Sequence, residues 1–188
     1  MPERDAIELA TNPDRVSKHS FLPFIQYELE EPRYRASENA VQIKRRPIAF
    51  ASHADSHIYS FFSHQLRLLH EEALLGKLAA ESVLAYRAFP GGKCNIHFAN
   101  EAFQEVIRRG DCVTIAMDVE DFFGSLEHEV LKTAWKRLLQ KENLPLDHYA
   151  VWKNLCRYSW ILRDKLFEEF AIGRKRPRQP VGILSQIG

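Results

Sequence analysis

Apolar side chains recur at steps of three and four positions over residues 56–75, a pattern that predicts an amphipathic helix. The stripe consists of Ile58, Phe61, Phe62, Leu66, Leu69 and Leu74, and Gly76 is a suitable helix stop. Similar stripes predict one helix over residues 126–139 and another over residues 147–158. A shorter helix is expected over residues 101–109, with Asn100 as its N-cap and Gly110 after its last turn.

Strict alternation of apolar and small or polar positions makes residues 113–119 the clearest predicted strand. Residues 41–51 are predicted as a strand or hairpin arm interrupted by Pro47, and residues 82–87 as a short extended piece. Helices and strands follow one another without the regular alternation of a parallel sheet. The sequence therefore predicts the α+β class.

Charge is unevenly distributed along a chain of 188 residues whose formal net charge is only +1. Basic residues gather in two clusters, one at 44–46 and one made of Arg174, Lys175, Arg176 and Arg178. Acidic residues gather between positions 118 and 129. Such a pattern suits a phosphate-rich ligand held near metal ions, while solvated surface charge is the alternative for any single cluster.

Cysteine usage and hydropathy indicate the cellular compartment in which the protein is expected. The 3 cysteines are scattered, as expected of free thiols in a reducing environment. No apolar run approaches the roughly 20 residues of a membrane helix, and the N-terminus is too charged for a secretory signal. We therefore expect a cytoplasmic protein that makes no membrane contact.

Asp118 is the most informative single residue, because it stands at the end of the predicted strand. Its neighbours on that face, Thr114 and Ala116, are small and leave room for a ligand. A carboxylate in this position suits Mg²⁺ shared with substrate phosphates. The alternative is an aspartate that only caps the following turn.

Several segments resemble reverse transcriptases, which are RNA-directed DNA polymerases. Residues 118–128, DVEDFFGSLEH, resemble the palm motif, which has Asp, an aliphatic residue, two variable residues and Phe-Phe. Upstream, residues 44–48 and 51–59 resemble the fingers strand and the helix start that follows it, and residues 83–87 with 93–99 resemble the Ala-Tyr-Arg segment. Over about residues 20–163 the chain looks closest to bacterial enzymes associated with phage defence, relatives of retron and group II intron reverse transcriptases.

The resemblance implies the fingers and an incomplete palm of a right-hand polymerase. Residues 1–40 would form an N-terminal extension, residues 41–112 a fingers-like region, and residues 113–170 the first part of the palm. Residues 171–188 would form a basic loop. RNA template, DNA or RNA primer and deoxynucleotide triphosphates are the implied partners.

The resemblance also implies roles for individual residues. Asp118 would be catalytic, and with the carbonyl of Val119 it would bind Mg²⁺ or Mn²⁺. Phe123 would exclude a ribose 2′-hydroxyl, with core packing as the alternative, whereas Phe122 is expected in the core. Arg87 would touch the template or brace the fingers. Nucleotide contacts are implied for Lys44, Arg45 and Arg46, and nucleic-acid contacts for Lys93, Arg174, Lys175, Arg176 and Arg178.

Two family motifs, Tyr-x-Asp-Asp and Gly-x-Pro-Gln-Gly, do not occur in these 188 residues. We therefore expect this chain alone to be inactive and to be completed by a C-terminal portion or by a partner chain. A non-catalytic nucleic-acid-binding module and a partner-dependent scaffold remain as alternatives.

Overall fold

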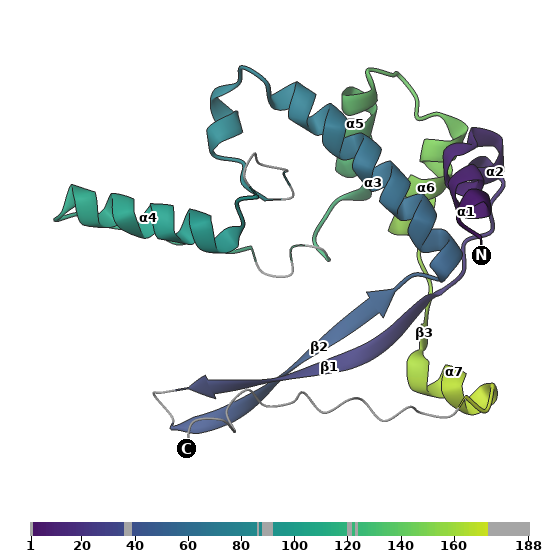
Figure 1. Cartoon of the computed structure of the whole chain (residues 1–188), viewed down its shortest axis with the longest axis horizontal. Helices are drawn as coiled ribbons and strands as arrows, with labels where there is room; N and C mark the ends of the chain where they lie inside the picture. The colour runs from purple at the N-terminus through teal and green to yellow at the C-terminus, as the bar shows by residue number, and fades with distance from the viewer. Residues whose placement is uncertain are drawn as a thin grey trace. The chain divides into compact units, whose positions relative to one another are not determined.

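The computed structural model describes residues 2–35, 39–85, 87, 92–119, 122 and 124–172 (Figure 1). The chain divides into two compact units, each built from two separate stretches of sequence. One unit contains residues 1–20 and 56–156, and the other contains residues 21–55 and 157–188. Helices and a small sheet together place the chain in the predicted α+β class.

The unit of residues 21–55 and 157–188 is built on a long hairpin (Figure 1). Strand β1 (Phe24–Arg35) pairs antiparallel with β2 (Ala40–Phe50), in continuous register from Ile25 opposite Phe50 to Arg35 opposite Ala40. Strand β3 (Trp160–Leu162) adds to β1 in parallel, so that the strand order is β2-β1-β3. Helix α7 (Arg163–Glu169) follows β3 directly.

The hairpin differs from the sequence-based expectation in two ways. Strand β2 is not interrupted, and Pro47 lies within it opposite Glu28. Proline is tolerated there because β2 is an edge strand, where half of the N–H groups face away from the neighbouring strand. Strand β1 was not predicted from residues 1–40, because Glu28, Glu30 and Glu31 obscure its alternation.

Helix α3 (His53–Leu74) confirms the strongest helix prediction. The Ser52 hydroxyl accepts a hydrogen bond from the Asp55 N–H at 3.1 Å, as an N-cap does. The Asp55 carboxylate is 1% exposed and accepts a hydrogen bond from the Leu22 N–H at 3.0 Å. A buried carboxylate is costly unless hydrogen-bonded, so this contact fixes the chain before β1 against the start of α3.

The other unit has a helical core. Helices α1 (Glu3–Thr11), α2 (Pro13–Ser17), α5 (His128–Leu139) and α6 (Leu146–Cys156) contribute to it, and α2 packs on α6. The predicted helices over residues 126–139 and 147–158 are thereby confirmed with slightly different ends. The buried apolar side chains of this core are Ala6, Ala10, Val16, Ile58, Phe62, Leu74, Trp135, Val151 and Trp152.

Helix α4 (Asn95–Arg109) begins earlier than predicted, so Asn100 lies inside the helix and is not its N-cap. Cys94 occupies the cap position instead. Its side chain accepts from the His97 backbone N–H, and the His97 ring accepts from the Cys94 N–H at 3.0 Å. Gly110 ends the helix with a φ of 72°, as expected for a residue after the last turn. A short 3₁₀ turn, η1 (Leu78–Glu81), precedes this region, and residues 82–85 and 87 contain no strand.

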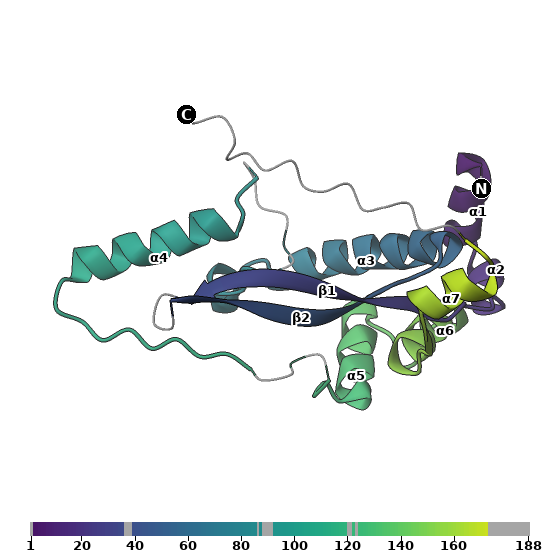
Figure 2. The same ribbon diagram turned by 90° about the horizontal axis from the view of Figure 1, so that it is seen from below.

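The strand predicted over residues 113–119 is wrong. These residues form neither helix nor strand, and Figure 2 draws them as a plain trace after α4. Val113 is 90% exposed and Met117 is 92% exposed. Alternation predicts a strand only if a neighbour takes up its backbone hydrogen bonds, and no described strand pairs with this segment.

Among the described residues, no helix combines the length and the apolar character needed to cross a membrane.

His148 lies at the centre of three core helices. Its Nδ1 accepts a hydrogen bond from the Trp135 indole N–H at 3.1 Å, and its ring centroid lies 4.7 Å from that of Phe62. Burial lowers the pKa of His148 below its ordinary value, against the opposing charge of Asp147. The neutral imidazole is therefore the form that the folded protein holds.

Acid should weaken this core. The unfolded chain binds a proton on His148 at higher pH than the folded chain does, so stability falls as the pH drops below about 6.5. The variant His148→Asn keeps an acceptor for Trp135 but does not titrate. Urea unfolding at pH 7.5 and 5.5 should show a larger loss of stability on acidification in the wild type than in His148→Asn. Equal losses would contradict this role of His148.

Candidate functional site

Asp118 and Val119 lie in the segment that follows α4 and that forms neither helix nor strand. One carboxylate oxygen of Asp118 accepts a hydrogen bond from the Val119 N–H at 3.0 Å. Both residues are exposed, and Val119 is 60% accessible. This bond between neighbouring residues is local, and the exposed carboxylate of Asp118 remains accessible.

A two-metal site needs more oxygen ligands than this carboxylate supplies. Within the described part of the chain, no group of three or more His, Cys, Asp or Glu side chains could hold a metal ion. Mg²⁺ usually binds through one or two carboxylates together with substrate phosphates. Asp118 and the Val119 carbonyl therefore do not fit a two-ion centre by themselves.

Several predicted residues lie outside the described residues. They are Phe123, Arg174, Lys175, Arg176 and Arg178. Phe122 is described, and it is 49% exposed, so its expected place in the core is wrong. An aromatic ring beside a strand is usually covered by the sheet, but residues 113–119 form no strand that could cover it.

The register of the hairpin separates the basic cluster at positions 44–46. Side chains alternate along a strand, so Lys44 and Arg46 share one face of the sheet and Arg45 lies on the other. Arg33, which stands opposite Gln42, joins the face of Lys44 and Arg46. We call this the cationic face, made of Arg33, Lys44 and Arg46 around Glu31.

Acidic partners are distributed unequally between the two faces. The Arg45 Nε donates to the Glu30 carboxylate at 3.0 Å, a one-to-one ion pair. On the cationic face, Glu31 lies 3.6 Å from Arg46 and 3.9 Å from Arg33. Lys44 has no acidic partner among the described residues. Two arginines therefore share one carboxylate and Lys44 has none, so this face keeps a positive charge that an anion can neutralise.

The cationic face continues into an aromatic end near β3. The Arg163 guanidinium lies 4.7 Å from the centroid of the Tyr27 ring, which meets Phe50 edge-on at 6.1 Å. Tyr27 and Phe50 occupy the same sheet face as Arg46. A guanidinium stacked on an aromatic ring is held in place while its outer N–H groups can still donate.

Sequence reasoning missed Arg33, Tyr27 and Arg163. For the first two, the only signal is the alternation of residues 24–35 opposite the predicted arm at 41–51, and Glu28, Glu30 and Glu31 obscure it. Arg163 comes from a distant stretch, and only the parallel pairing of β3 with β1 brings it to this sheet.

Lys93 lies before α4 and already has a partner. Its ammonium lies 2.6 Å from the Glu101 carboxylate, and both side chains are about half exposed. Exposed pairs of this kind contribute little stability, so Lys93 can exchange Glu101 for a phosphate at low cost. Its contact with nucleic acid stays a prediction.

Arg87 braces the end of α3 against the turn that follows. Its Nε and one terminal nitrogen donate to the Glu71 carboxylate at 2.8–3.1 Å, while the other terminal nitrogen donates to the carbonyls of Ala80 and Val83. The Arg87 side chain is 13% exposed. Hydrogen bonding to Glu71 raises the pKa of Arg87 above its ordinary value, against partial desolvation. The geometry favours bracing over contact with a template.

Replacing Arg87 should therefore damage the fold and not the affinity for nucleic acid. We expect Arg87→Lys to lower the urea midpoint, because an ammonium cannot serve the Glu71 carboxylate and two carbonyls in this planar arrangement. Affinity for single-stranded DNA, measured well below that midpoint, should stay within about twofold of wild type, because the Arg87 donors already have protein partners. An unchanged midpoint with a large loss of affinity would assign Arg87 to the template instead.

Comparison with models of known protein families finds no match to this chain, and no curated protein matches it. The resemblance of its motifs to reverse transcriptases therefore supports a proposed function, but the chain is not assigned to that family.

Proposed function

We propose that this chain is the fingers and partial palm segment of an RNA-directed DNA polymerase of the reverse transcriptase kind, and that the cationic face of its hairpin binds phosphates. The segment would act on an RNA template with a DNA or RNA primer and deoxynucleotide triphosphates. A role in antiviral defence accompanies this proposal through the resemblance alone.

The cationic face is the observation that carries the proposal. Lys44 and Arg46 belong to the segment that resembles the fingers strand, and they stand beside Arg33 with only Glu31 between them. Guanidinium groups bind phosphate oxygens through two parallel N–H donors, and a lysine adds a mobile point charge. A row of such groups beside aromatic rings is typical of surfaces that follow a nucleic-acid backbone.

A nucleic-acid-binding module without catalysis is the second candidate. The exposed Asp118, with no metal-binding group around it in the described part of the chain, favours this alternative for the chain alone. Both candidates require the same phosphate contacts. They differ only in whether nucleotide transfer follows binding.

The two faces of the hairpin provide a matched pair of variants. Arg46→Gln should weaken binding of a fluorescent single-stranded DNA by about three- to tenfold, because a charge-assisted contact is lost. It should also flatten the dependence of log affinity on log salt by about 0.7, the value for one phosphate contact to a single strand. Arg45→Gln removes the same charge from the opposite face and should change affinity less than about twofold.

Equal effects of the two variants would contradict a specific role for the cationic face. They would indicate a general response to net charge.

Nucleotide transfer should be absent from this chain. With Mg²⁺ or Mn²⁺ and a primed RNA or DNA template, we expect no primer extension, because the Tyr-x-Asp-Asp motif that completes a two-ion site in this family does not occur in these 188 residues. Denaturing gels with radiolabelled nucleotide measure this directly. Extension that disappears in Asp118→Asn would overturn the expectation, while single-strand affinity should be the same in both proteins.

A further inference from the structure

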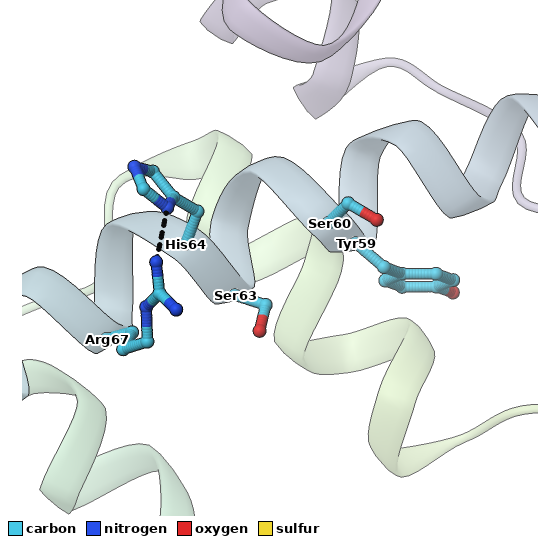
Figure 3. Close-up of a pocket in the computed structure, with 5 residues that line it drawn as sticks. All are labelled: Tyr59, Ser60, Ser63, His64 and Arg67. Atoms are coloured by element: carbon cyan, nitrogen blue, oxygen red, sulfur yellow. Dashed lines mark hydrogen bonds between the residues drawn. The ribbon is translucent and has the colours of Figure 1, made fainter. Parts of the chain in front are cut away.

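A hollow of about 450 Å³ lies along one side of α3. It is lined by Tyr59, Ser60, Ser63, His64 and Arg67 (Figure 3). Ser60, Ser63, His64 and Arg67 stand at i, i+3, i+4 and i+7, so they form one stripe on the helix surface. Tyr59 is held at the edge of this stripe by a hydrogen bond to its hydroxyl from the Asn154 amide of α6.

Arg67 and His64 are joined in a way that fixes the imidazole tautomer. A guanidinium nitrogen of Arg67 lies 3.1 Å from the His64 Nδ1 (Figure 3). Because arginine can only donate, His64 Nδ1 must accept, and the proton of the neutral ring is then on Nε2. His64 therefore presents an N–H donor, and Arg67 retains four of its own N–H groups.

The stripe contains unused donors and no acid. Within the described part of the chain, neither the Ser60 nor the Ser63 hydroxyl makes a side-chain hydrogen bond, and Arg67 forms no ion pair. The next acid along α3 is Glu71, whose carboxylate is held by Arg87 at 2.8 Å. The positive charge of Arg67 is thus left for a ligand.

We propose that this hollow binds a phosphate group through Arg67, with the hydroxyls of Ser60 and Ser63 as further donors and with the His64 ring bonded to Arg67 beside it. Phosphate offers several acceptor oxygens and negative charge, which match three donor side chains without a carboxylate. Ser60, Ser63, His64 and Arg67 are all exposed, so the hollow is open to a ligand from solvent. The phosphate can come from a free phosphate compound or from the backbone of a nucleic-acid strand. None of these residues belongs to the cationic face of the hairpin, so the inference goes beyond the proposed function.

NMR of the full chain tests this site. Inorganic phosphate, titrated at constant ionic strength balanced with chloride, should shift the imidazole signals of His64 along a saturable curve. Arg67→Gln should weaken this binding by about tenfold or more, the loss expected for a contact between charged groups. The double variant Ser60→Ala and Ser63→Ala keeps the charge and should weaken it by a smaller factor, because alanine preserves the helix and only hydroxyl donors are lost.

Arg4→Gln, an exposed change on α1, is the matched control and should bind phosphate as the wild type does. A non-saturable shift of His64, or the same affinity in Arg67→Gln and Arg4→Gln, would overturn the proposal.

A second titration with a short single-stranded DNA identifies the source of the phosphate. If the strand shifts the His64 signals at lower concentration than inorganic phosphate does, the site receives a nucleic-acid backbone. If only inorganic phosphate shifts them, the site receives a free phosphate compound. Arg46→Gln should weaken strand binding and leave the response of His64 to inorganic phosphate unchanged. The proposal for the cationic face and the proposal for the hollow on α3 can therefore fail independently.

Discussion

The pairing register of β1 with β2 is the constraint on which the candidate interface depends. Because side chains alternate at every position, a slip of one residue would move each side chain of β2 to the opposite face relative to β1. In the observed register, Lys44 stands opposite Glu31 and Arg45 stands opposite Glu30. The register thus gives Arg45 a carboxylate of its own, while Arg46 and Arg33 share Glu31 and Lys44 has no acidic partner among the described residues.

Two contacts hold one end of this register in place. The buried Asp55 carboxylate accepts the Leu22 N–H just before β1, and the parallel pairing of β3 with β1 fixes the same end of the hairpin. Arg163, placed over the Tyr27 ring at the beginning of α7, then occupies the aromatic end of the sheet face. The cationic part of that face, at the other end of the hairpin from β3, is then available to a ligand.

The sequence predicts α3 well because its apolar stripe is long and its burial does not depend on another strand. Residues 113–119 show the opposite case, since their alternation can form a strand only beside a neighbour that the described residues do not provide.

Lys44 and Arg46 are visible in the sequence as a basic cluster. The pairing of β1 with β2 places them on the face opposite Arg45 and on the same face as Arg33. This pairing could not be predicted, because the glutamates of β1 obscure the alternation of that strand. The donor stripe of Ser60, Ser63, His64 and Arg67 could have been found from helical spacing alone, but not the fact that Arg67 lacks an acidic partner.

Chemical footprinting of lysines tests the central claim most directly, because Lys44 reports on the cationic face without any substitution. The acetylation rate of Lys44, measured by mass spectrometry, should fall several-fold when a single-stranded DNA is bound at saturation, since the ammonium is then covered by phosphate. Lys18, an exposed lysine after α2, should react at the same rate with and without the strand. Equal rates for Lys44 in the free and bound protein would contradict the account.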